Sequence, residues 1–446
     1  MHHDIHGLPI STASAQAAAV FDRTIEAYLK FRADTPVHLK SLLTADPEFV
    51  LAHCLKGYFA LLSYKQANVP LAAEAAQAAR RLANSATPRE QAHVAALEMW
   101  IAGDLDRAIS IWEQTSSEHP LDMLAFRLAH GSNFWLGRRN AMRSSAARVK
   151  PKWSSDLAGY GTILSCYCFA SEECGDYAAA EPSGRAAIEI DRADIWGTHA
   201  VAHVMEMQGR HADGIAWLDE LQRHWGPGAN LVHHLWWHRA LFHLERREID
   251  AVLELYDNRF RNLSAPLTQA QPDLYIDIQN AASMLFRLEL LGIDVGNRWD
   301  EIADKAEARS GDCLSAFTLP HWLMALAATG RHEAARRMLE GMRAFGSGEG
   351  TVAKIVGQIA VPMCEAVLAH RKRDYQRAVE LMRPVLDDMH QLGGSHAQQD
   401  VLMQLFLDSA VKADYADDVR LILRRAGRSG DLGKRLGYAA AAHLAH

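Results

Sequence analysis

A short turn phrase recurs along this sequence and limits the folds that the chain can adopt. Each copy begins with a glycine, continues with a charged residue, and reaches a small residue five positions later. The copies are Gly103–Ala108, Gly175–Ala180, Gly209–Gly214 and Gly330–Ala335, with a shortened copy at Gly137–Arg138 and one without glycine at Arg373–Ala378. Gly103 and Gly137 stand 34 residues apart, as do Gly175 and Gly209, so one structural unit repeats along the chain.

Each position of the phrase has a physical role in a helical hairpin. Glycine ends a helix where a left-handed residue is needed. The Asp or Arg after it begins the next helix, and the small residue lets two helices approach closely. A helix–turn–helix unit of about 34 residues is the tetratricopeptide repeat (TPR) period. We therefore expect an all-α fold, a TPR-like α-solenoid of antiparallel helical hairpins that forms a right-handed superhelix.

Composition agrees with a long helical array. The chain has 446 residues, of which 49% are hydrophobic and 23% charged, so it can build a large core. No clear linker interrupts it, and we expect a single continuous repeat domain over 1–446. The repeats are clearest over about 47–225 and degenerate over 226–446. The turn near Arg246 lacks its glycine, and the period is unclear between Asn297 and Arg309.

Charge and cysteine content narrow the functional class. The formal net charge is −7 and no long basic run occurs, which argues against nucleic-acid binding. The spacing Cys166-x-Cys168 fits neither a zinc knuckle nor a redox pair, so we expect the six cysteines to be reduced core residues. The N-terminus has no signal pattern and no run of about 18 apolar residues is evident, so we expect no membrane segment and a cytoplasmic location.

Several phrases go beyond a generic TPR sequence. They are Asp4–Ser11, Ala45–His53, His199–Gly209, His234–His238 and Gly393–Gln398. Together they resemble the tetratricopeptide repeat protein 38 family over nearly the whole chain, and the His199–Gly209 phrase is the most specific. The resemblance implies a stand-alone TPR-like fold and no settled activity.

One helix face concentrates groups that can coordinate a metal or transfer protons. In TPR-like arrays the first helix of each hairpin lines a concave groove. Residues ten, six and three before the turn glycine share one stripe of that helix. Before Gly209 these residues are His199, His203 and Glu206.

The next hairpin adds a second polar stripe. Asn230, His234 and His238 are spaced by four, so they share a helix face. We expect the two stripes to meet in one pocket of the concave groove. Further candidates for substrate binding are Arg127, Glu172, Trp196, Trp237, Asp277, Arg287 and His321.

Three alternative functions are consistent with this site. In the first, His199, His203, Glu206 and His234 hold a divalent metal such as Zn, Fe or Mn, because two histidines four apart on a helix are a known ligand pair. Glu206 does not stand between the histidines, so the metalloprotease phrase is absent.

In the second, an enzyme acts on a small polar or anionic substrate with or without metal. His203, Glu206 and His238 would be its catalytic residues, since imidazole and carboxylate exchange protons near neutral pH. Arg287 would neutralise the substrate, and Trp196 and Trp237 would form apolar walls.

In the third, the groove binds a peptide or partner protein, for which Arg127 and Asn230 are suitable clamps. The structural alternative is that the histidines are hydrogen-bonded core residues. The interpretation we adopt is a TPR-like protein that binds a small polar ligand or peptide in a His-rich groove, with the enzyme as the alternative. The sequence leaves the ligand, the reaction and the oligomeric state open.

Overall fold

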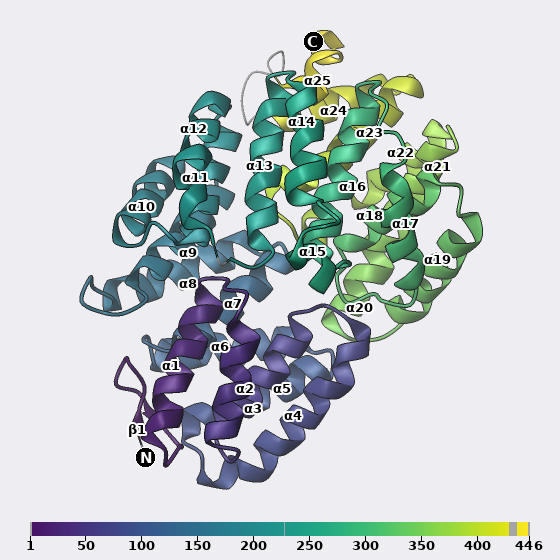
Figure 1. The fold of residues 1–446 in the computed structure, drawn as a ribbon. Coiled ribbons are helices and arrows are strands. Elements are labelled where there is room, and N and C mark those ends of the chain that lie inside the picture. Colours follow the sequence, from purple (N-terminus) through teal and green to yellow (C-terminus); the bar gives the residue numbers. More distant parts are fainter. Residues whose placement is uncertain (1, 227, 428–434, 445–446) are drawn as a thin grey trace. The chain divides into compact units, whose positions relative to one another are not determined.

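The computed structural model describes residues 2–226, 228–427 and 435–444, and these are almost entirely helical (Figure 1). The described strands are β1 (His2–His3) and β2 (Pro9–Ile10), which pair antiparallel with His2 opposite Ile10. The N-terminal hairpin that they form was not expected. The predicted all-α fold is confirmed, while the handedness of a superhelix stays a prediction.

The chain divides into two compact units, which we describe separately. The first unit comprises Met1–Val201 and Leu221–Leu231, and the second comprises Ala202–Glu220 and Val232–His446. The division falls inside α11 (Ile195–Met207) and at the end of α12 (His211–Leu221).

The first unit is a series of helix pairs, in which each helix packs on the next one along the chain. The pairs are α1 (Ala15–Leu29) with α2 (Thr35–Ala45), α3 (Val50–Leu61) with α4 (Val69–Leu82), α5 (Pro88–Ile101) with α6 (Leu105–Glu118), α7 (Met123–Trp135) with α8 (Arg139–Val149), and α9 (Tyr160–Glu173) with α10 (Tyr177–Ile190).

The second unit continues the same plan less regularly. Its longer helices are α13 (Leu231–Glu245), α16 (Tyr275–Leu290), α17 (Arg298–Ala308), α18 (Thr318–Ala328), α19 (His332–Gly346), α21 (Val361–Arg371), α23 (His396–Lys412) and α24 (Ala416–Gly427). Shorter helices are α14 (Ile249–Leu255), α15 (Pro266–Ala270), α20 (Thr351–Ile355), α22 (Tyr375–Met382) and α25 (Leu436–Ala439). Helix α16 packs against both α18 and α23, so it is central to this unit (Figure 1).

The turn phrases form the predicted helix ends. All five turn glycines have a positive φ, for example 85° at Gly103 and 77° at Gly175. Asp104 and Asp176 then cap the next helix by accepting a hydrogen bond from a backbone N–H three residues on. Where glycine is missing, a bulkier residue takes the left-handed conformation, with φ of 61° at Arg247 and 63° at Arg373.

Small residues lie where neighbouring helices approach each other closely, as expected. A Cβ atom at Gly57 in α3 would lie 2.5 Å from Leu97 in α5. At Gly184 in α10 it would lie 2.6 Å from Val201, and at Gly214 in α12 it would lie 2.4 Å from the Phe242 ring. These glycines therefore receive side chains of a following helix. The stretch with an unclear period, between Asn297 and Arg309, forms α17.

One helix among the described residues is long and apolar enough to cross a membrane, by length and composition. It is Thr351–Arg371, which has 21 residues and a mean hydropathy of 1.6. It consists of α20 and α21, which a π-helical turn at Val356–Ala360 joins into one helix. Half of its most apolar window is buried inside the protein, as in a core helix. The expectation that the chain has no membrane segment stays a prediction.

Candidate functional site

Three histidines of the second unit lie together. His203 comes from α11, and His234 and His238 come from successive turns of α13. One ligand nitrogen of each lies within 4.8 Å of one ligand nitrogen of the others. The His238 ring packs edge-on against both partners, with ring centroids 4.4 Å from His203 and 4.7 Å from His234. Helix periodicity thus places His234 and His238 on one face of α13, as the sequence predicted.

This histidine cluster is buried. The exposed fraction is 0% for His203 and His238 and 2% for His234. We expected these histidines to line a concave groove, and the structure buries all three rings. An extended peptide cannot lie against these rings without displacing helices.

Burial also determines the charge state of the cluster. It lowers the pKa of His203 well below the usual range, and the neighbouring His234 acts in the same direction. Burial lowers the pKa of His234 to about 4, although its hydrogen bond to Asn280 opposes the change. Both imidazoles are neutral at pH 7, which is the form that coordinates metals.

Asn280 on α16 holds His234 in one orientation. Its Oδ1 atom lies 2.8 Å from the His234 Nδ1 atom, so Nδ1–H donates to the amide oxygen. The lone pair of the ring is then on Nε2. The Trp237 ring stacks on His234 at a centroid distance of 5.0 Å and an interplanar angle of 12°. Such a hydrogen bond fixes the tautomer of a metal-ligating histidine.

Glu206 does not belong to the group of atoms within 4.8 Å, although the sequence placed it among the metal ligands. It follows His203 by three residues on α11. Burial raises the pKa of Glu206 to about 8, with a contribution from the Glu245 carboxylate. Its Oε2 atom is buried without a hydrogen-bond partner among the described residues. Glu206 is therefore a protonated carboxyl group at neutral pH.

Arg287 on α16 is already engaged. Its guanidinium donates to the Ala397 carbonyl over 2.9 Å and lies 3.8 Å from the Asp400 carboxylate. Asp400 also accepts from Arg435 over 2.7 Å and from the Tyr438 hydroxyl over 2.6 Å. Burial would raise the pKa of Asp400, but the two arginines outweigh it and the pKa is lowered. Arg287 thus neutralises a carboxylate of the protein itself.

The remaining candidates of the second unit are core residues with local partners. Asp277 is buried and pairs with His233, whose Nδ1 atom lies 3.0 Å from its Oδ2 atom. His321 is buried, and its Nδ1–H donates to the Phe317 carbonyl over 2.8 Å. The structure therefore places Asp277 and His321 outside the histidine cluster.

The first unit contains the other candidates. Arg127 is buried, and its guanidinium lies 5.3 Å from the Phe31 ring centroid and 4.8 Å from that of Trp196. His199 packs on Trp196 at a centroid distance of 4.8 Å. Trp196 thus contacts a cation of the protein itself, and its role as a wall of a substrate site stays a prediction.

Glu172 and Asn230 are also buried in the first unit. Burial raises the pKa of Glu172 well above its usual range, and the neighbouring Glu173 carboxylate adds to this. Asn230 is the residue before α13 begins. The predicted substrate-binding set is therefore distributed over both units.

Sequence reasoning missed two groups of residues. The first is Asn280 and Asp400, which contact the candidates from α16 and α23. A signal existed at Asn280, because Gln279 and Asn280 are polar residues inside an otherwise apolar helix. No repeat phrase marked that helix.

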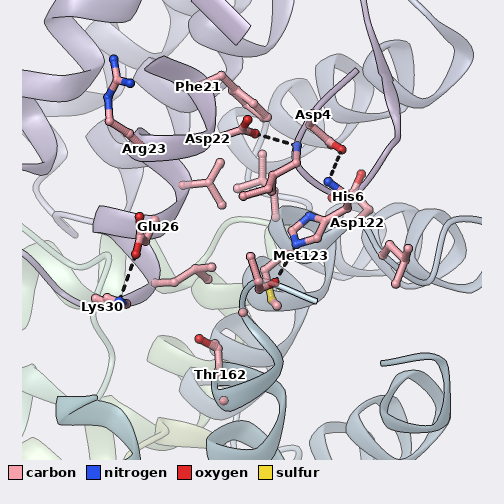
Figure 2. Close-up of a pocket in the computed structure, with 18 of the residues that line it drawn as sticks. Asp4, His6, Phe21, Asp22, Arg23, Glu26, Lys30, Asp122, Met123 and Thr162 are labelled. Atoms are coloured by element: carbon pink, nitrogen blue, oxygen red, sulfur yellow. Dashed lines mark hydrogen bonds and ion pairs between the residues drawn. The ribbon is translucent and has the colours of Figure 1, made fainter. Parts of the chain in front are cut away.

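The second group lines a cavity of about 550 Å³ in the first unit (Figure 2). Its walls come from the N-terminal hairpin, α1, the start of α7, the start of α9 and the residues around the end of α10. The residues labelled in Figure 2 include Asp4, Asp22, Glu26 and Asp122, all carboxylates. None of them stands on a repeat stripe, so their proximity was invisible in the sequence.

Comparisons with known proteins give weak similarities to two solved structures and no match to a family model. A crystal structure of yeast Tom70 is similar over 96% of this chain and 95% of its own, with 11% identity and a TM-score of 0.36. A structure of Naa15/Naa10 bound to HypK-THB is similar over 93% of this chain and 64% of its own, with 11% identity and a TM-score of 0.25. At these values the similarities carry no functional argument. From its own helix pairs, the chain is an all-α protein of TPR-like helical hairpins.

Proposed function

We propose that this chain is a TPR-like protein that binds a divalent transition-metal ion through His203, His234 and His238. The observation that supports the proposal is the convergence of three buried imidazoles from α11 and α13 within 4.8 Å. Imidazole ligands suit Zn, Fe, Ni and Cu. Nitrogens in a tetrahedral zinc site lie about 3.3 Å apart, given bonds of about 2.0–2.1 Å. Small side-chain rotations bring the three rings to that distance.

The proposed ligand set differs from the predicted one. It keeps His203 and His234, exchanges Glu206 for His238, and does not include His199, which belongs to the first unit. We also propose that the resemblance to the tetratricopeptide repeat protein 38 family reflects kinship, since two of its phrases carry the three proposed ligands.

Metal content of the untagged full-length protein tests this function. We expect about one zinc, iron, nickel or copper ion per chain by elemental analysis. After chelation, added Zn²⁺ or Co²⁺ should bind with a stoichiometry of one. His203→Gln and His238→Gln should each weaken binding at least tenfold, because each removes one ligand nitrogen.

His321→Gln is the matched control. His321 is as buried as the cluster and belongs to the same unit, but it is outside the group of ligand atoms. The His321→Gln variant should bind metal with the affinity of the wild type. A wild-type chain that takes up neither Zn²⁺ nor Co²⁺ would contradict the proposed function, as would equal losses in all three variants.

A specific observation favours a second candidate, the enzyme. Glu206 lies one turn beyond His203 and is partly exposed, but its Oε2 atom is buried and has no hydrogen-bond partner among the described residues. Such a group can exchange a proton with a water molecule or substrate on the metal. In the Co²⁺-loaded protein, a pH-dependent visible spectrum that Glu206→Gln shifts would support this role. A spectrum that ignores the substitution would exclude it.

A further inference from the structure

The cavity of the first unit has the size and the mixed lining of a small-molecule site. Its volume of about 550 Å³ falls within the usual range for such sites, roughly 300–1,000 Å³. Apolar side chains form much of the lining. They are Ile5, Phe21, Ile25, Leu29, Leu121, Met123, Leu124 and Ile190.

The polar part of the lining carries excess negative charge. Six carboxylates line the cavity, namely Asp4, Asp22, Glu26, Asp122, Asp191 and Asp194, whereas three basic residues do, namely Arg23, Lys30 and Arg89. Two of the basic residues are bound internally. Arg89 pairs with Asp122 over 2.8 Å, and Lys30 lies 3.0 Å from Glu26 and 2.9 Å from Asp191.

Asp4 and Asp22 are neighbours, and their ionic contact is long, because Arg89 lies 3.8 Å from the Asp4 carboxylate and pairs more closely with Asp122 over 2.8 Å. Asp22 accepts a hydrogen bond from the Ile5 N–H over 3.1 Å, which places it beside the turn that contains Asp4. Asp4 accepts from the backbone N–H groups of His6 and Leu8, and its nearest cation, Arg89, is 3.8 Å away. Figure 2 shows both carboxylates at one end of the cavity.

The wall that carries Asp4 is firmly fixed. The His6 ring donates from Nε2 to the Ala158 carbonyl over 2.8 Å and packs edge-on against Trp153 at 4.9 Å. Further along, Ser11 donates to the Glu90 carboxylate over 3.0 Å from its backbone N–H. A cavity with fixed walls binds ligands at a lower entropic cost.

We propose that this cavity binds a small organic ammonium ion, an alkyl chain with a primary amine, whose charged end lies at Asp4 and Asp22. The apolar residues would contact the alkyl chain, and the two carboxylates would accept hydrogen bonds from the ammonium group. A metal ion fits less well. Among the described residues, these carboxylates do not form a group of three ligand atoms within 4.8 Å.

The pKa values of the two carboxyl groups also favour a cationic ligand. Burial raises the pKa of Asp4 and of Asp22, and the Asp4 charge adds to the effect at Asp22. A bound ammonium ion would add positive charge beside both carboxylates and oppose these shifts. This inference concerns a different unit from the metal site and does not depend on it.

Calorimetric titration of the full chain with three six-carbon probes tests the proposal. Hexylammonium chloride should bind at one site per chain, at least tenfold more tightly than 1-hexanol, and hexanoate should not bind. Binding should tighten from pH 5 to pH 7.5, because the carboxylates ionise while the amine, with a pKa of about 10.4, stays charged. Equal binding of hexanol would overturn the proposal, as would full displacement of the ammonium ion by one equivalent of Ca²⁺.

Two variants act on different properties of the cavity. Asp22→Asn removes the charge and keeps the acceptor for the Ile5 N–H, so folding is retained and ammonium binding should fall at least tenfold. Thr162→Trp fills the cavity without changing charge and should abolish binding of every probe. Asp106→Asn, an exposed carboxylate on α6 outside the cavity, is the control. Unchanged binding in both cavity variants would overturn the proposal.

Discussion

The Nδ1 atom of His234 and the Oδ1 atom of Asn280 lie 2.8 Å apart and join α13 to α16. This contact orients one ring of the histidine cluster from outside the cluster. Residues that orient metal-binding histidines typically affect affinity by about 10–100-fold when replaced.

Asn280→Ala should therefore weaken Zn²⁺ binding by about 10–100-fold while leaving all histidines in place. The affinity is measured by competition with a chelator. Ser283→Ala is the control, since Ser283 is buried on the same helix but bonds only to the backbone carbonyl of Asn280. Wild-type affinity in Asn280→Ala would show that the contact has no role in metal binding.

Gly214→Ala should destabilise the protein by about 1–3 kcal/mol, the usual cost of overpacking. The new methyl group would lie 2.4 Å from the Phe242 ring, so one helix must move. The free energy of unfolding in urea measures the effect, and adding Phe242→Leu should restore part of the loss. Gly341→Ala, also within a helix but with its nearest contact at 3.4 Å, should be neutral or stabilising.

Arg373→Gly should raise the stability by about 1 kcal/mol. Arg373 has a φ of 63°, a conformation that costs a non-glycine residue about 1–2 kcal/mol. The flexibility of glycine in the unfolded chain offsets part of this gain. The preceding residue, Lys372, has a φ of −82°, so Lys372→Gly should instead lower the melting temperature. Equal shifts in the two variants would refute the assignment of strain.

Asp122 should make stability depend on acid pH. Burial would raise its pKa, but the adjacent His93 and Arg89 outweigh burial and lower the pKa far below the unfolded value of about 3.9. A lowered folded pKa gives stability that is fully present above about pH 4 and is lost as the pH falls below it. Asp122→Asn removes this contribution and leaves Arg89 buried without its ion pair, at a cost of about 3–5 kcal/mol near pH 7.

Urea unfolding of both proteins between pH 3 and pH 7 checks this prediction. The stability difference between wild type and Asp122→Asn should shrink as the pH falls below about 4. Asp194 should have the opposite effect on the pH dependence of stability, because burial raises its pKa. The free energy of unfolding of the wild type should therefore decrease relative to that of Asp194→Asn as the pH rises above about 4. A difference that is constant with pH at either position would contradict the assigned shift.

The fold was largely predictable because its signals are local. The glycine that ends a helix and the aspartate that begins the next one, as at Gly103 and Asp104, act within a few residues. The same is true of the capping box at Thr87 and Glu90, which the structure forms. Helix periodicity likewise placed His234 and His238 on one face.

The sequence could not reveal contacts that depend on how helices cross. Asn280 meets His234, and Asp400 meets Arg287, across separations that no repeat period specifies. The burial of His203 could not be predicted for the same reason, since helix periodicity gives the face that a residue shares and not what covers that face. The acidic cavity depends on a hairpin turn and on helix ends, which fall outside the repeat.

The glycines under Leu97, Val201 and Phe242 give the array a direction. In each case a side chain of a later helix enters the recess, although at Gly184 the Cys168 side chain of the preceding helix is about as close. The surface of each hairpin is therefore complementary to that of the next hairpin. Deleting one hairpin would bring together two surfaces that are not complementary. Length changes in such a chain should be tolerated at its turns and ends, and whole-hairpin deletions should not.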